Sequence, residues 1–226
     1  MKEKNKDKII SVMCLSGVIA FIFYILHDII GALNYPGYDW LSQAVSDLTA
    51  VGAPSRIIAG GLSSVYGVFS CMCLVLSCLY FCDKENKLFR LGIYLFTLMS
   101  FISSIGYNLF PLSESGTSGT TFQDIMHVYV ITVLVVLLSI TSLVLITIGG
   151  LRNKTNMFFT ITAIIALILM MIGGIGFNIV PEEIKGLIER FSNYSAVIFT
   201  AIIGSYIFYQ EIIKKKGLDS NEKRNS

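Results

Sequence analysis

Six long apolar stretches, bounded by charged residues or by Gly and Pro, recur along the chain. They cover residues 9–30, 57–81, 91–110, 125–151, 157–180 and 191–209. A bilayer core about 30 Å thick takes roughly 20 helical residues to cross. The pattern therefore predicts an all-α membrane protein with six transmembrane helices, in which residues 1–226 form a single polytopic membrane domain.

Composition agrees with this pattern and excludes other classes. The chain is 54% hydrophobic and only 14% charged, and its mean hydropathy is +0.71, well outside the range of soluble globular domains. The formal net charge is +2, and the basic residues flank the apolar stretches, which argues against nucleic acid as a partner. The centres of the six stretches hold no Asp, Glu, Lys, Arg or His, which disfavours an ion-coupled transporter.

The orientation follows from the distribution of Lys and Arg, which are enriched in cytoplasmic loops. Fourteen of the 17 lie in the two termini and the second and fourth loops, and the other three are Arg56, Lys185 and Arg190. This bias predicts a multi-pass protein of the cell membrane with both termini in the cytoplasm. The opposite end is called outer in this subsection.

Two nearly identical segments end the third and fifth stretches: "IGYNLFP" at residues 105–111 and "IGFNIVP" at residues 175–181. The first stretch ends similarly with "GALNYP". Proline disfavours helical geometry at the preceding residue, and an Asn side chain can bond carbonyls left open at a helix end. We predict that the motif ends three outward helices, each the start of a repeated helical hairpin. Asn108 and Asn178 then either complete helix ends or line a shared outer vestibule.

The outer loops are predicted to contain short interfacial helices. Asp39 can cap a helix whose apolar residues share one face, with Gly52 and Pro54 ending it and with Gln43 paired to Asp47. Pro181 and the acidic residues after it suit the start of a second short helix.

Three short motifs resemble one bacterial family of six-helix membrane proteins, catalogued as domain of unknown function 998. They are "SDLTAVGAP" at residues 46–54, Phe110-Pro111 followed by His127, and "GLIER" at residues 186–190. All three fall at the outer end, and the resemblance spans nearly the whole chain. It implies the six-helix fold and topology and assigns no activity.

The leading hypothesis is a protein that binds a lipid headgroup or a small hydrophobic ligand at a polar outer vestibule, with membrane lipids as its partners. The vestibule residues would be Asp47, Asn108, Asp124, His127, Asn178, Glu189 and Arg190. A structural ion pair, either Asp47 with Arg190 or His127 with Glu189, is expected to hold the outer ends together.

The alternative is an interfacial hydrolase acting on a lipid-like ester or amide. Its nucleophile would be Ser46, with His127 as base, or water activated by a divalent metal. The weak metal-ligand candidates are His27, Asp28, Asp47, Asp124 and His127. With only two histidines and no paired His spacing, the sequence favours ion pairs, and no cofactor is expected. Facilitated transport or export through the bundle is a third hypothesis.

Overall fold

The computed structural model describes residues 2–116, 120–152 and 157–222, excepting the side chains of residues 2–5 and 214–222. These residues form helices and no strand: α1 (Lys2–Met13), α2 (Ser16–Leu33), η1 (Val45–Thr49), α3 (Arg56–Phe81), α4 (Lys87–Leu109), α5 (Phe122–Ile125), η2 (Met126–Ile131), α6 (Thr132–Arg152), α7 (Met157–Gly176), η4 (Glu182–Ile184) and α8 (Lys185–Glu222). Lys154, Lys223 and Arg224, which contribute to the charge bias, lie outside the described residues.

Among the described residues, six helical segments are long and apolar enough to cross a membrane, which confirms the expected fold class. They are Lys6–Leu33, Arg56–Phe81, Lys87–Leu109, Phe122–Arg152, Met157–Gly176 and Glu182–Ile213. The fourth contains a π-helical segment, η2.

The first span is not one continuous helix, although its apolar run predicts one. It is interrupted at Cys14 and Leu15, just before Ser16 and Gly17, and Gly and Ser pairs are common sites of helix kinks. An ideal Cβ placed on Gly17 would lie 2.7 Å from the carbonyl oxygen of Thr200 in α8. The interruption therefore lies where the first span is in close contact with α8.

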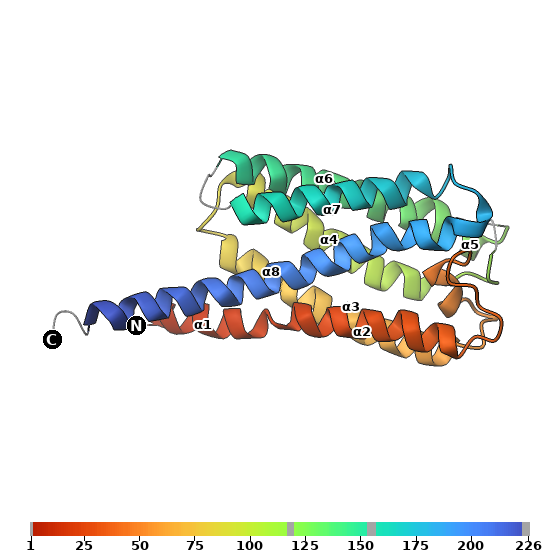
Figure 1. Ribbon diagram of the computed structural model, residues 1–226, viewed down its shortest axis with the longest axis horizontal. Coiled ribbons are helices and arrows are strands. Elements are labelled where there is room, and N and C mark those ends of the chain that lie inside the picture. Colours follow the sequence, from red (N-terminus) through yellow and green to blue (C-terminus); the bar gives the residue numbers. More distant parts are fainter. Residues whose placement is uncertain (1, 117–119, 153–156, 223–226) are drawn as a thin grey trace.

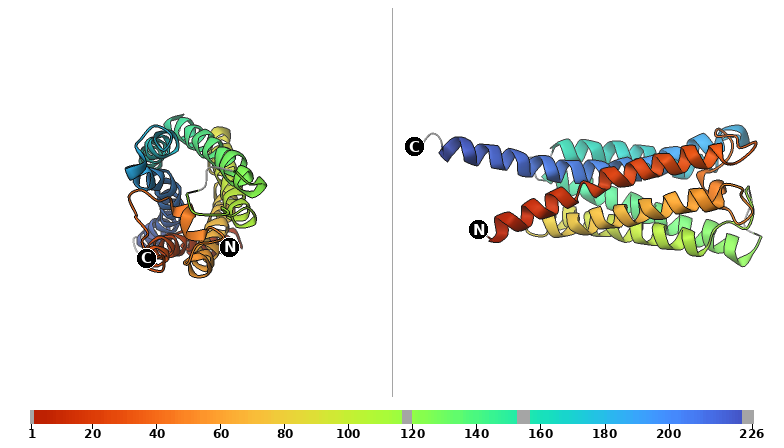
Figure 2. Two further views of the ribbon diagram at one scale, coloured as in Figure 1. Left: turned by 90° about the vertical axis from the view of Figure 1, so that its right-hand side faces the viewer. Right: turned by 90° about the horizontal axis from the view of Figure 1, so that it is seen from below.

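The helices form a ring around the long axis of the molecule (Figure 2). Each long helix contacts the next along the chain: α2 with α3, α3 with α4, α4 with α6, α6 with α7, and α7 with α8. Contacts between α8 and α2 close the ring. Each predicted hairpin is thus a pair of neighbouring helices, and both described ends of the chain lie at the same end of the bundle (Figure 1).

Aromatic side chains fill the interior of this ring. Phe96 of α4 and Phe159 of α7 both contact Phe199 of α8, with ring centroids 5.4 and 5.6 Å apart. Phe81 and Phe89 extend the same cluster, and all five rings are almost completely buried. Because they come from opposite sides of the ring, their side chains occupy its centre, where the ribbons alone leave a gap.

The Gly, Asn and Pro repeat has the predicted structural role at the helix ends. The side-chain amide of Asn108 donates to the carbonyl of Ser104, 2.7 Å away, and Asn178 donates to Gly174 at 3.5 Å. Both side chains are exposed and bond within their own helix, so neither is brought into the polar cluster described below. Asn34 makes the same bond to Ile30 in the first hairpin.

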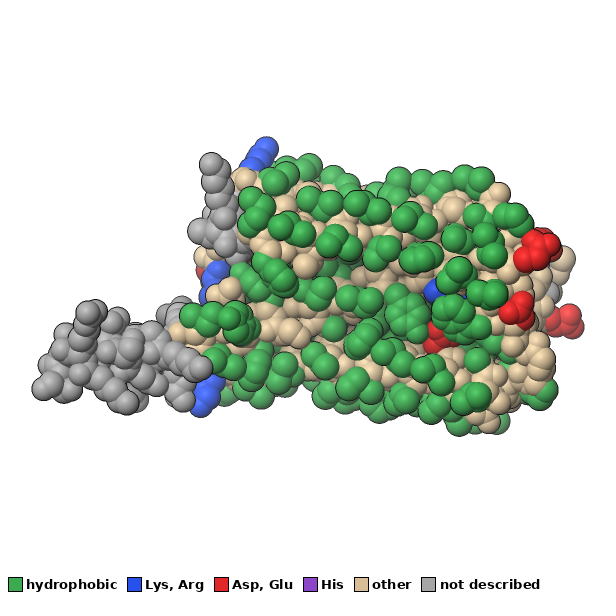
Figure 3. Space-filling view, in the orientation of Figure 1, with side chains coloured by type: hydrophobic (Ala, Val, Ile, Leu, Met, Phe, Trp, Pro, Cys, Tyr) green, Lys and Arg blue, Asp and Glu red, His purple; other side chains and the backbone are tan. Residues whose placement is uncertain are grey.

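Charged side chains separate to the two ends of the bundle. On the face shown in Figure 3, Lys and Arg gather mostly at the end where the termini lie, and Asp and Glu at the other. We call these the basic end and the acidic end. The acidic end comprises the segments 34–55, 110–116 and 177–184 with the adjoining helix ends. A wide hydrophobic band lies between the two ends, as expected for a bundle that crosses a bilayer.

Candidate functional site

Arg190 lies at the centre of a buried polar cluster at the acidic end. Its Nη2 lies 2.8 Å from Oδ1 of Asp28, and its Nε lies 3.0 Å from Oδ2 of the same carboxylate. Nη2 also donates to the hydroxyl of Tyr38, while Nη1 donates to the carbonyls of Trp40, Gln43 and Gly186. Arg190 and Asp28 are 3% and 1% exposed, so this ion pair is fully buried.

Aromatic side chains complete the cluster. The Tyr194 hydroxyl donates to Asp28 at 3.0 Å, and the Trp40 indole donates to it at 3.3 Å. The guanidinium carbon of Arg190 lies 4.2 Å from the Trp40 ring centroid, within the range of cation–π contacts. Because the five N–H donors of Arg190 are all directed at protein acceptors, the cluster holds helices and loop together and leaves no free donor for a ligand.

The loop that covers the cluster differs from the predicted interfacial helix. Residues 40–42 form turns, and the short helix η1 begins only at Val45. Asp39 accepts from the backbone N–H of Leu41 and the hydroxyl of Ser42, a local turn that competes with helix formation. The expected pairing of Gln43 with Asp47 was wrong, because the Gln43 side chain accepts from the N–H of Asp39.

Both alternatives for the expected ion pair were also wrong. Asp47 accepts from the backbone N–H groups of Ala44 and Gly116, at 3.0 and 2.8 Å, and is 3% exposed. Glu189 accepts from the backbone N–H of Val45 at 2.8 Å. Asp47 therefore joins two loops, and Glu189 ties the first of them to α8, whereas Arg190 pairs with Asp28. Backbone N–H groups are common partners of buried carboxylates, but their identity cannot be read from residue types.

Ionisable groups in the loop have shifted pKa values. Burial raises the pKa of Asp47 above its usual value, although the N–H groups of Gly116 and Ala44 act in the opposite direction. Burial also raises the pKa of Tyr38. The Ser42 hydroxyl and the Leu41 N–H lower the pKa of the exposed Asp39. The buried Asp47 therefore differs electrostatically from Asp39 in the same loop.

The proposed nucleophile and base do not form a catalytic pair in this geometry. Nδ1 of His127 donates to the carbonyl of Phe110 at 2.7 Å, since a carbonyl can only accept. Asp124 accepts from the N–H and hydroxyl of Ser113 and from Thr121, and it completes a capping box at the start of α5. Among the hydrogen bonds of the described residues, none joins Ser46 to His127.

The metal-ligand candidates are likewise dispersed. Nδ1 of His27 donates to the carbonyl of Ala59 at 2.9 Å, and Asp28 is paired with Arg190. Within the part of the chain that the structure describes, no three His, Cys, Asp or Glu side chains are grouped so that they could hold a metal ion.

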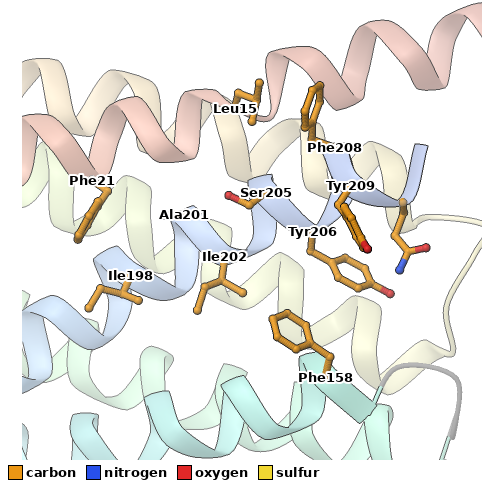
Figure 4. A pocket seen from close by; sticks show the side chains of 11 residues that line it. Leu15, Phe21, Phe158, Ile198, Ala201, Ile202, Ser205, Tyr206, Phe208 and Tyr209 are labelled. Carbon is orange, nitrogen blue, oxygen red and sulfur yellow. The ribbon is translucent and has the colours of Figure 1, made fainter. Parts of the chain in front are cut away.

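A lateral groove, which sequence reasoning missed, lies along α8 on the side of the bundle. Its volume is about 660 Å³, and α8 lines it from Ile198 to Gln210, facing Leu15, Phe21 and Phe158 (Figure 4). One sequence signal was present. Ser205, Tyr206, Tyr209 and Gln210 are spaced i, i+1, i+4 and i+5, which places four polar residues on one face of an apolar helix.

The fold and these two sites define an integral, multi-pass helical membrane protein whose charges lie at its ends. The chain belongs to the family described as "Protein of unknown function (DUF998)", whose model matches residues 18–206. This confirms the resemblance carried by the three short motifs at residues 46–54, 110–127 and 186–190. No curated protein matches the chain, and no solved structure matches it.

Proposed function

We propose that this protein binds a lipid-like amphiphile in the lateral groove, with the acyl chain lying along α8. The observation that carries the proposal is the groove itself, whose lining is mostly apolar. Its volume of about 660 Å³ lies within the roughly 300–1,000 Å³ typical of small-molecule sites. The sequence hypothesis of a lipid or hydrophobic ligand is kept, but the site moves from the acidic end to the side of the bundle.

The position of the groove supports a bilayer lipid as its ligand. Its lining residues belong to three segments that are apolar enough to cross a membrane: Lys6–Leu33, Met157–Gly176 and Glu182–Ile213. Ile198 and Tyr209 on its wall are 40% and 60% exposed. The open side of the groove therefore faces hydrocarbon, and a bilayer lipid can enter without crossing water.

The packing of the bundle supports binding over conduction. The aromatic cluster around Phe96, Phe159 and Phe199 occupies the centre of the ring between the acidic and basic ends. A solute moving along the axis would have to displace these rings, whereas a lipid in the lateral groove displaces no core side chain.

Native mass spectrometry of the purified protein tests the proposal. We expect the parent to retain one lipid after mild removal of detergent. Ala201→Trp, which fills the groove with an indole, should release that lipid. Val68→Trp is the matched control, because Val68 is 67% exposed on α3 and away from the groove. Equal lipid retention by the parent and by Ala201→Trp would contradict the proposed function.

A further inference from the structure

Polar side chains are confined to one end of the lateral groove. The residues around Phe21 and Ile198 are apolar, whereas Ser205, Tyr209 and Gln210 line the part nearer the basic end. In Figure 4 the phenol oxygens of Tyr206 and Tyr209 point toward that same end, away from Phe21. The groove is therefore polarised along α8, as an amphiphile is along its own length.

Two of these polar groups have no hydrogen-bond partner among the described side chains and backbone. Serine and threonine in membrane helices usually donate to the carbonyl four residues earlier, as Ser64 does to Gly60 and Thr200 to Ala196. Among the hydrogen bonds of the described residues, none involves the hydroxyl of Ser205 or of Tyr209. Polar groups in hydrocarbon without partners are unfavourable, so a ligand that bonds to them gains affinity at this end of the groove.

The length of the groove fits a single lipid chain within one leaflet. From Ile198 to Gln210, α8 rises about 18 Å at 1.5 Å per residue. Half of a hydrocarbon core about 30 Å thick is roughly 15 Å. A chain lying from Phe21 toward Ser205 would therefore place its polar group near the membrane boundary on the basic side.

The groove favours an uncharged polar group. Among the side chains that the structure describes, those lining the groove include no Asp, Glu, Lys, Arg or His. The side-chain amide of Gln210 interacts with the Tyr206 hydroxyl. Hydroxyls and an amide recognise hydroxyl, ester and amide groups directly. A carboxylate or phosphate in this position would have no cation in the lining to offset its loss of hydration.

We propose that the groove selects an amphiphile with an uncharged hydroxyl, ester or amide group, which bonds to Ser205, Tyr209 and Gln210. This inference rests on the proposed function, because it assigns the ligand class of the same groove.

Photolabelling tests the ligand-class inference separately from the proposed function. The parent is placed in phosphatidylcholine nanodiscs with a monoacylglycerol or a fatty acid of the same chain, each with a diazirine at mid-chain, at a pH where the fatty acid is ionised. We expect the monoacylglycerol to label the groove residues and to exceed the fatty acid at least severalfold. Because a neutral hydrogen bond contributes roughly a 2- to 10-fold change in affinity, Ser205→Ala/Tyr209→Phe should reduce monoacylglycerol labelling about 5-fold or more and leave fatty-acid labelling unchanged.

The control is Ser64→Ala/Tyr94→Phe, which removes a serine and a tyrosine hydroxyl from α3 and α4, outside the groove. If both probes label the groove equally and the Ser205→Ala/Tyr209→Phe variant changes neither, the ligand-class inference is overturned while the proposed function stands. Stronger labelling by the fatty acid would also overturn it. If neither probe labels the groove, both proposals fail.

Discussion

Arg190 and Asp28 lie 162 positions apart in the chain and form a two-pronged, fully buried ion pair, with Nη2 2.8 Å from Oδ1 and Nε 3.0 Å from Oδ2. The pair joins α2 to α8, the first and last long helices of the ring, at the acidic end. The same guanidinium bonds to carbonyls of the loop between α2 and α3. Arg190 therefore joins both helices and the loop at this end, where Tyr194 of α8 also donates to Asp28.

Breaking this pair should destabilise the protein strongly. Asp28→Asn or Arg190→Met leaves a buried charge or several buried acceptors uncompensated, and such changes typically cost about 3–5 kcal/mol. Arg190→Lys should not rescue stability, because an ammonium cannot reproduce the fork that contacts Asp28 and Tyr38. Thermal unfolding in one detergent measures the effect, and the double variant Asp28→Leu/Arg190→Met should recover part of the loss.

The matched control is the exposed pair of Lys185 and Glu182, whose Nζ and Oε1 lie 3.3 Å apart. Lys185→Ala should change the free energy of unfolding by no more than about 1 kcal/mol. Comparable losses for Lys185→Ala and Arg190→Met would show that the buried pair has no special role in closing the ring.

Asp47 should give the stability of the acidic end an unusual pH dependence. Because burial raises the pKa of Asp47, the folded protein holds this proton more tightly than the unfolded chain does. The contribution of Asp47 to stability is therefore full below its pKa in the unfolded chain, about 3.9. It is lost as pH rises through its raised pKa in the folded protein. As pH rises from 4 to 7, the unfolding temperature of Asp47→Asn should therefore increase relative to that of the parent.

Asp39→Asn serves as the control with the opposite sign. The pKa of Asp39 is lowered, so its contribution is present above about pH 3.9 and is lost as pH falls through the lowered value. A difference in unfolding temperature between Asp47→Asn and the parent that does not vary with pH would contradict the burial argument.

The fold was predictable because it depends on regular, repeated patterns. The apolar runs gave all six candidate spans, and the two Asn-containing motifs ended α4 and α7 as expected. Departures occur where tertiary contact overrides local pattern. The apolar run of the first span gave no indication of its interruption at Cys14 and Leu15, which is associated with close approach to α8.

The polar sites were predictable only in part. The motifs at the acidic end contain Asp47 and Arg190, whereas Asp28 entered only as a weak metal-ligand candidate. The choice of partner for each of them depends on fractions of an ångström in tertiary packing. Residue type predicts that a buried carboxylate has partners and does not reveal that Asp47 uses backbone N–H groups. The groove could not be predicted, because it depends on the curvature and spacing of three helices, which the pattern of a single helix does not encode.

The charge bias makes a topological prediction: the basic end faces the cytoplasm. In a cysteine-free background, Glu183→Cys at the acidic end should react with a membrane-impermeant maleimide on intact expressing cells. Lys87→Cys at the start of α4 should react only after permeabilisation. Both positions flank candidate spans in the structure. The reverse labelling pattern would contradict the predicted orientation.

Close contact at small residues should make some glycines indispensable and others replaceable. A Cβ on Gly173 of α7 would lie 2.5 Å from the Cβ of Ser192 in α8 and would also overlap its backbone nitrogen, which cannot rotate away. Gly173→Ala should therefore force α7 and α8 apart and cost about 1–3 kcal/mol or more. Gly61→Ala on α3 is the control, because nothing lies within 4 Å of its Cβ position.

Alanine is favoured over glycine within a helix by about 1 kcal/mol, so Gly61→Ala should leave the unfolding temperature unchanged or raise it slightly. Both substitutions add the same methyl group to a helix that spans the bundle, so the difference between them isolates the contact with the neighbouring helix. If Gly173→Ala is as stable as Gly61→Ala, the close contact between α7 and α8 at Gly173 and Ser192 is contradicted.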